Sequence, residues 1–183
     1  MKTFIIGLIV GILLVPFGFW MYMRSGSAPV ATNEPPMPLE HYFAKTALHA
    51  RLDKVMPRTV PIAADESTYL AGAQVYKDNC AECHGYVNKK ETPGVMFPRP
   101  PQLLQGKDMV TDDPPGETFW KVQNGIRLSG MPAFSDRLTT EQMWQVALLL
   151  KHADKLPDPT MQTLMYAPPA PPAPAPAKTA KRK

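Results

Sequence analysis

The longest apolar run in the chain covers residues 4–23, where 20 consecutive positions carry no charge. A helix of that length would rise about 30 Å, enough to cross the hydrocarbon core of a bilayer. Trp20 and Tyr22 suit the membrane interface near its end. A cleaved signal peptide is the alternative, but its apolar core is usually about 7–15 residues long. We expect residues 1–24 to be a single N-terminal transmembrane anchor, or an uncleaved signal-like segment.

Residues 25–63 are predicted to form a linker with one short amphipathic segment, because residues 25–38 have the composition of a linker. Within it, residues 39–56 carry apolar groups at helical spacing. We expect this segment to lie either on the membrane or on the following domain. The apolar positions are Phe43, Ala47, Leu48, Leu52 and Val55.

Residues 64–157 carry the patterns of a compact, mostly helical domain, with no alternating run that predicts a strand. Three helices with recognisable ends are expected there. They run from a cap at Asp65 or Ser67 to the cysteines near 80, over residues 117–124 before Gly125, and from the Thr139/Gln142 capping box to about Ala153. Long Pro- and Gly-containing loops separate them, so the protein core alone would be thin.

Residues 158–183 form the last predicted segment, a disordered Pro/Ala-rich tail that ends in a basic cluster. Four basic residues in this cluster and two beside the N-terminal apolar run account for six of the 20 in the chain. The remaining body has 14 basic against 16 acidic side chains. A nearly neutral body lacks the basic surface of a nucleic-acid-binding protein.

The two cysteines of the chain both lie in the stretch Cys-Ala-Glu-Cys-His-Gly, as Cys80 and Cys83 followed by His84. Positions i, i+3 and i+4 share one face of a helical turn. C-x-x-C-H is the attachment signature of haem c: two thiols bond one porphyrin, and the histidine becomes the proximal iron ligand. A thioredoxin-like thiol pair, a zinc site and a chance match are the alternatives at this point.

A second feature favours haem over these alternatives. Met131 lies in a Gly-Met-Pro loop before the last predicted helix, and a thioether is a common distal ligand of electron-carrying haem. Met96 and Met109 are the next candidates for the distal position. We interpret His41, His49 and His152 as surface or packing residues.

The chain at this point resembles the class I c-type cytochromes and is similar to membrane-anchored bacterial monohaem members of that family. The resemblance covers residues 66–156 and rests on AGAQVYKDNCAECHG, FPRPPQL, FWKVQNGIRLSGMPAF and LTTEQMWQVALLL. It implies an all-α, small cytochrome c fold of three to four helices around one covalently attached haem c. The ligands would be Cys80, Cys83, His84 and Met131, with the iron held by His84 and Met131.

The resemblance also implies packing details. Gly72 and Tyr76 match residues that pack across the last helix. On that helix Trp144 would supply the aromatic partner, and Leu149 stands where many relatives have a second aromatic residue. A proline carbonyl after the haem motif would accept the ring N–H of His84. Pro98, Pro100 and Pro101 compete for this role, and we favour Pro100. Three further side chains could contact a haem propionate or be ordinary surface residues: Arg99, Trp120 and Arg127.

The expected function is single-electron transfer between redox partners at the outer face of the cytoplasmic membrane, with no catalysis by the chain itself. The donor would be a dehydrogenase or quinol-oxidising complex, and the acceptor an oxidase or reductase. Two alternatives stay open. The haem could have a labile sixth ligand and bind or reduce a small molecule, or the chain could be a haem subunit of a larger membrane oxidoreductase.

Overall fold

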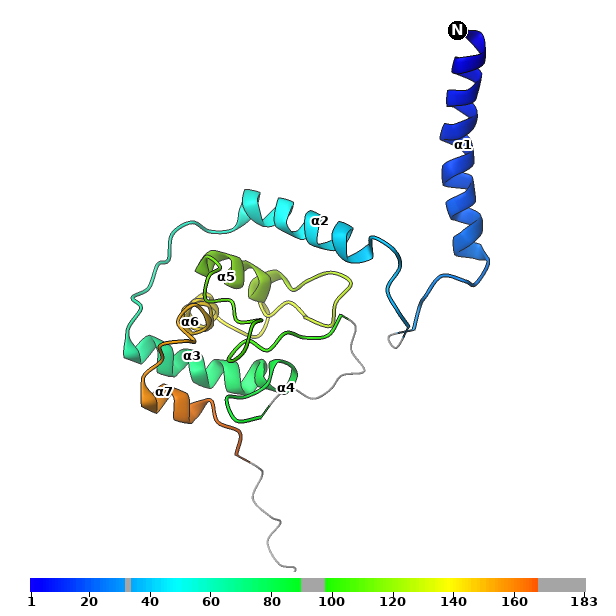
Figure 1. Cartoon of the computed structure of the whole chain (residues 1–183). Coiled ribbons are helices and arrows are strands. Elements are labelled where there is room, and N and C mark those ends of the chain that lie inside the picture. The colour runs from blue at the N-terminus through cyan, green and yellow to red at the C-terminus, as the bar shows by residue number, and fades with distance from the viewer. Residues whose placement is uncertain (32–33, 90–97, 168–183) are drawn as a thin grey trace, which may run out of the picture.

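The computed structural model describes residues 1–31, 34–89 and 98–167, and within these ranges the chain forms helices and loops without any strand (Figure 1). The expected all-α architecture is therefore confirmed. The helices are α1 (Lys2–Arg24), α2 (Glu40–Val55), α3 (Glu66–Asn79), α4 (Ala81–His84), α5 (Pro115–Asn124), α6 (Thr140–Lys151) and α7 (Asp158–Thr163).

Helix α1 contains the whole apolar run and stands apart from the rest of the chain (Figure 1). It has 23 residues, a mean hydropathy of 2.5 in its most apolar window, and no buried side chain. These properties are those of a helix that can cross a membrane. At its end the guanidinium of Arg24 lies 5.1 Å from the centre of the Trp20 ring, an arrangement that suits the membrane interface.

The helix ends of the domain follow from local side-chain hydrogen bonds. The carboxylate of Asp65 accepts from the backbone N–H of Thr68 at 2.8 Å and caps α3. At α6 the Thr139 hydroxyl accepts from the N–H of Gln142 at 3.2 Å, and the Gln142 side chain accepts from the N–H of Thr139 at 2.9 Å. Both ends lie where the sequence predicts them, because these bonds satisfy N–H groups that the first turn leaves unpaired.

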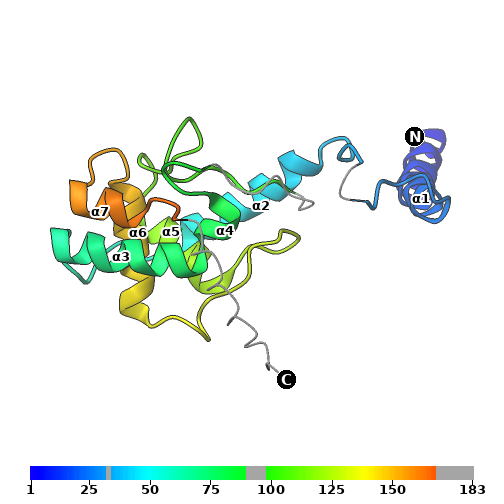
Figure 2. The same ribbon diagram turned by 90° about the horizontal axis from the view of Figure 1, so that it is seen from below.

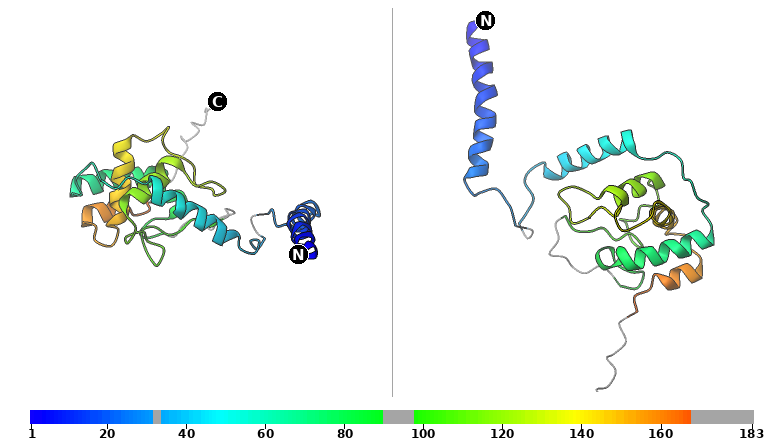
Figure 3. Two further views of the ribbon diagram at one scale, coloured as in Figure 1. Left: turned by 90° about the horizontal axis from the view of Figure 1, so that it is seen from above. Right: turned by 180° about the vertical axis from the view of Figure 1, so that it is seen from behind.

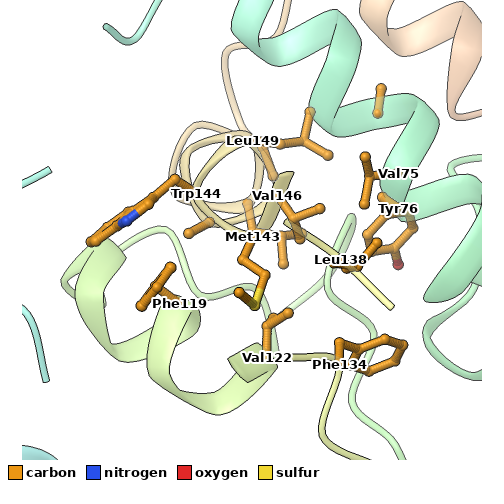
Figure 4. Packing of buried hydrophobic residues seen from close by; sticks show 14 of the residues in the cluster. Val75, Tyr76, Phe119, Val122, Phe134, Leu138, Met143, Trp144, Val146 and Leu149 are labelled. Carbon is orange, nitrogen blue, oxygen red and sulfur yellow. The ribbon is translucent and has the colours of Figure 1, made fainter. Parts of the chain in front are cut away.

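The core forms where α3 and α5 pack on α6 (Figure 4). Gly72 lies at the crossing of α3 and α6, where a Cβ atom would collide with the carbonyl oxygen of Gln145 and lie 3.2 Å from Leu149. The predicted role of Trp144 at this crossing is wrong. Trp144 points to the other side of α6 and stacks on Phe119 of α5, with ring centres 4.2 Å apart. Positions 144 and 149 are five residues apart and so face different neighbours of one helix.

The chain continues to contribute to the core beyond residue 157, the end of the expected cytochrome domain. Helix α7 packs against α3 (Figure 2), and Leu164 after it is completely buried in the core. Only a few apolar residues lie between Pro157 and the Pro/Ala-rich stretch. The sequence pattern therefore indicates a tail there.

The close approach at Gly72 generates a stability prediction. Gly72→Ala should lower the free energy of unfolding by about 1–3 kcal/mol, because the added methyl group has no space between α3 and α6. Helix propensity alone predicts the opposite, since Ala favours a helix by about 1 kcal/mol over Gly. Denaturant unfolding of both proteins measures the difference.

The matched control is Gln74→Ala on the exposed face of the same helix, which should change stability by no more than about 0.5 kcal/mol. A Gly72→Ala protein that is as stable as the parent, or more stable, would contradict the packing described here.

Candidate haem site

The two cysteines and His84 lie on one helical turn at the end of α3. The Cys80 N–H donates to the carbonyl of Tyr76 at 2.8 Å and so ends α3, while the Cys80 carbonyl accepts from the N–H of His84 at 2.9 Å and starts α4. The Cys83 N–H also donates to this carbonyl, at 3.1 Å. These backbone bonds set the three side chains at the i, i+3 and i+4 positions of one turn.

Two side chains from outside α4 hold the end of this turn. The hydroxyl of Tyr76, a completely buried residue, donates to the carbonyl of Gly85 at 3.0 Å. The side-chain amide of Gln102 donates to the carbonyl of His84 at 3.0 Å. Gly85 has a φ of +81°, a backbone conformation that favours glycine. The turn is therefore fixed both to α3 and to the loop near residue 102.

The ring of His84 has a defined orientation. Its Nδ1 lies 2.8 Å from the carbonyl oxygen of Pro101, and a carbonyl only accepts, so Nδ1 carries the proton. The prediction of Pro100 for this role is wrong; the carbonyl that faces the ring belongs to the next residue, and spacing alone does not distinguish two adjacent prolines. Burial lowers the pKa of His84, and the bond to Pro101 opposes that shift.

His84 is thus a neutral imidazole at pH 7 whose Nε2 keeps its lone pair. Neutral imidazole is the form that binds a metal, and a bond from the other ring nitrogen fixes the tautomer of such ligands. The chemistry of this donor fits an axial iron ligand.

Met131 lies in a loop that is fastened back onto the end of α5. Its carbonyl accepts from the N–H of Ile126 at 3.2 Å, and its own N–H donates to the hydroxyl of Ser129 at 3.1 Å. Gly125, with a φ of +68°, lets the loop approach so closely that a Cβ there would lie 2.9 Å from the Met131 carbonyl oxygen. The side chain of Met131 packs against the hydrophobic core cluster.

The surroundings of the Cys80 thiol differ from those of a redox-active cysteine. Burial is the main cause that raises the pKa of the Cys80 thiol to about 12, and the nearby Cys83 raises it further. A thiol-exchange nucleophile needs a lowered pKa, because the thiolate is the reactive form. Among the residues that the structure describes, no group of three or more His, Cys, Asp or Glu side chains could hold a metal ion. The zinc alternative therefore finds no support in this part of the chain.

The other candidate residues occupy varied positions. Met109 also packs against the core cluster, so burial alone does not separate it from Met131. Met96 lies outside the described residues. The His152 ring lies 5.2 Å from that of Tyr69, as expected for a packing residue. Two further histidines, His41 and His49, are exposed, as are Arg99 and Arg127, while Trp120 is half-buried on α5.

A set of contacts that the sequence analysis missed supports the loop after the haem motif. Asn88 donates its side-chain amide to the carbonyl of Tyr166 at 3.2 Å and accepts from the N–H of Tyr166 at 2.6 Å. The Tyr166 ring meets that of Tyr86 edge-on, 5.2 Å between centres. The Val87 N–H donates to the carbonyl of Leu164 at 3.2 Å. Because these partners are far apart in the sequence, no local pattern predicts them.

Comparison with known proteins agrees with this geometry. Residues 67–150 match the family described as cytochrome C oxidase, cbb3-type, subunit III. The matched residues include the Cys80–His84 turn, Met131 and most of the three core helices. Together with the all-helical fold, this match shows that residues 67–150 form a class I c-type cytochrome domain. The apolar α1 that precedes the domain is long enough to cross a membrane.

Two curated relatives carry the name cbb3-type cytochrome c oxidase subunit FixP. The protein of Sinorhizobium medicae (strain WSM419) is 35% identical over 95 residues, which cover 48% of this chain and 30% of the relative. That of Rhizobium meliloti (strain 1021) is 35% identical over 85 residues, covering 42% and 27%. The chain thus matches less than a third of the length of these relatives.

The hydrogen bond from Tyr76 to Gly85 can be tested by Tyr76→Phe. This change keeps the buried ring but leaves the Gly85 carbonyl without that donor, and it should lower the free energy of unfolding by about 1–3 kcal/mol. Tyr69→Phe is the control, because Tyr69 contacts His152 through its ring, and it should cost less than about 0.5 kcal/mol. Equal effects of the two changes would mean that the bond does not hold the turn.

Proposed function

We propose that this chain is a monohaem electron carrier in which Cys80 and Cys83 would bind one haem c covalently and His84 and Met131 would hold its iron. The observation that carries the proposal is the C-x-x-C-H turn with Nδ1 of His84 fixed by the carbonyl of Pro101. This bond leaves Nε2 as the only ring nitrogen able to bind iron. The single motif in the sequence supports a single haem.

When bound, haem c supplies iron that changes between the ferric and ferrous states. The protein's task is then to keep two ligands in place in both states. The bond to Pro101 holds the His84 ring, and the fastened loop holds Met131. Burial in a low-dielectric core and a methionine ligand both raise the reduction potential. None of these groups exchanges a proton or leaves during electron transfer, so the chain acts as a carrier and not as a catalyst.

The proposed location is the outer face of the cytoplasmic membrane, in the periplasm, with α1 retained as a single-pass anchor. Lys2 before the apolar run favours this orientation, since positive residues stay on the cytoplasmic side, whereas Arg24 at the other end of α1 is a single opposing charge. An anchored domain on a linker is concentrated beside membrane-bound partners. The donor would be a dehydrogenase or a quinol-oxidising complex, and the acceptor an oxidase or reductase.

A second candidate function is supported by the comparisons. Both relatives are named as subunits of a cbb3-type cytochrome c oxidase, which favours an electron-carrying subunit within a membrane oxidase over a free carrier. Purification of the tagged full chain from its own membranes in mild detergent separates the two. A subunit would elute with oxidase polypeptides and oxidase activity in constant ratio, whereas a free carrier would elute alone.

The axial position of Met131 is tested with visible spectra of the reduced protein before and after carbon monoxide. The parent protein should show a reduced c-type spectrum that carbon monoxide leaves unchanged, because both axial positions are filled. Met131→Ala should open one position and give a clear carbon monoxide shift. Met109→Ala, the matched control in another loop, should behave like the parent.

A carbon monoxide shift in the parent protein would contradict the closed site and favour the alternative in which the sixth ligand is labile and a small molecule binds. A shift in Met109→Ala but not in Met131→Ala would assign the distal ligand to Met109.

A further inference from the structure

Helix α2 has two halves with different surroundings. In its C-terminal half Leu52 is buried to 1% exposure, and the following Pro57 contacts the backbone of Gly116 at the start of α5. In its N-terminal half the large apolar side chains are uncovered. Tyr42 and Phe43 are each 63% exposed, and Leu39, which precedes the helix, is 64% exposed. We refer to Leu39, Tyr42 and Phe43 as the aromatic end of α2.

The aromatic end has a defined conformation and is not a frayed helix terminus. The rings of Tyr42 and Phe43 meet edge-on with their centres 5.5 Å apart. The carboxylate of Glu40 accepts from the N–H of Met37 at 2.9 Å and fixes the entry to the helix. Leu39 has a left-handed backbone with a φ of +66°, which is unusual for a residue other than glycine. The structure thus keeps three exposed apolar side chains close together.

The position of the aromatic end along the chain relates it to the membrane. Only residues 25–38 separate it from the end of α1, a span of at most about 50 Å when fully extended. Figures 1 and 3 show that the N-terminal end of α2 faces this linker and that its C-terminal end lies over α5. The aromatic end is therefore the part of the folded domain that the anchor reaches first.

We propose that the aromatic end of α2 inserts into the interfacial region of the same membrane that α1 enters. Tyr and Phe rings with an adjacent Leu have the chemistry that the headgroup boundary accepts. The exposed Lys45 on the next turn can extend its ammonium group to lipid phosphates. Because the C-terminal half of α2 is docked on the domain, the helix becomes a second attachment that fixes the tilt of the domain relative to the membrane.

A lipid surface fits this patch better than a protein partner. A stable protein interface buries about 1,200–2,000 Å² and involves about 20–30 residues on each side. The aromatic end comprises three large side chains at one tip of a helix, and among the described residues of α2 no other large apolar side chain is exposed beside them. A lipid surface, in contrast, lies at the end of α1, and its binding does not require a large surface of matching shape.

A photoreactive residue at the aromatic end tests the proposal. The full chain, with p-benzoylphenylalanine in place of Phe43, is reconstituted into vesicles of phosphatidylcholine and phosphatidylglycerol and irradiated. Mass spectrometry should find lipid adducts on the α2 peptide. The control carries the same probe at Leu70, an apolar residue of α3 that is 42% exposed. Helix α3 lies on the side of the domain away from α2 (Figure 1). Adduct there should be several-fold lower.

Three results would overturn the proposal: adducts to a second copy of the chain, no lipid adduct at position 43, or equal lipid adducts at positions 43 and 70. A second variant removes the remaining apolar groups, with Leu39→Ser and Tyr42→Ser added to the probe at 43. It should reduce lipid adducts several-fold while the unfolding temperature stays unchanged, because both side chains are exposed. The intact mass of the reconstituted chain confirms that α1 is present, and no readout depends on bound haem.

Discussion

The contact between α3 and α6 at Gly72 is the constraint on which the rest of the structure depends. Only a residue without a side chain lets the two helices approach to the distance at which Gln145 and Leu149 lie against α3. This crossing packs α3 against α6, and α3 leads directly into the turn that Cys80 begins. It also buries Tyr76, whose hydroxyl holds the carbonyl of Gly85 at the other end of that turn. The same packing contact thus supports the C-x-x-C-H turn at residues 80–84.

The other parts of the site come from segments distant in sequence, each fastened to the same core. Pro101 orients the ring of His84, and the loop that carries Met131 is bound back to α5 across Gly125. The residues around Tyr166 add a support that lies beyond the 67–150 match to the cytochrome family.

The sequence predicted the local features well because they depend on neighbouring residues. The caps at Asp65 and Thr139, the apolar run of α1 and the C-x-x-C-H turn are all patterns within a few positions. What it could not predict depends on distant contacts: the choice of Pro101 over Pro100, the side of α6 that Trp144 faces, and the continuation of the core to Leu164. Each of these is decided by the direction of a group in three dimensions, which spacing does not contain.

The most direct test of the central claim is the mass of the denatured full chain after expression with haem-attachment machinery. Covalent attachment at Cys80 and Cys83 predicts the mass of the polypeptide plus one haem, and the polypeptide mass alone when both cysteines are replaced by serine. The contradicting result is a wild-type chain without added mass in cells that attach haem to another c-type cytochrome. It would favour a function of Cys80 and Cys83 as free thiols.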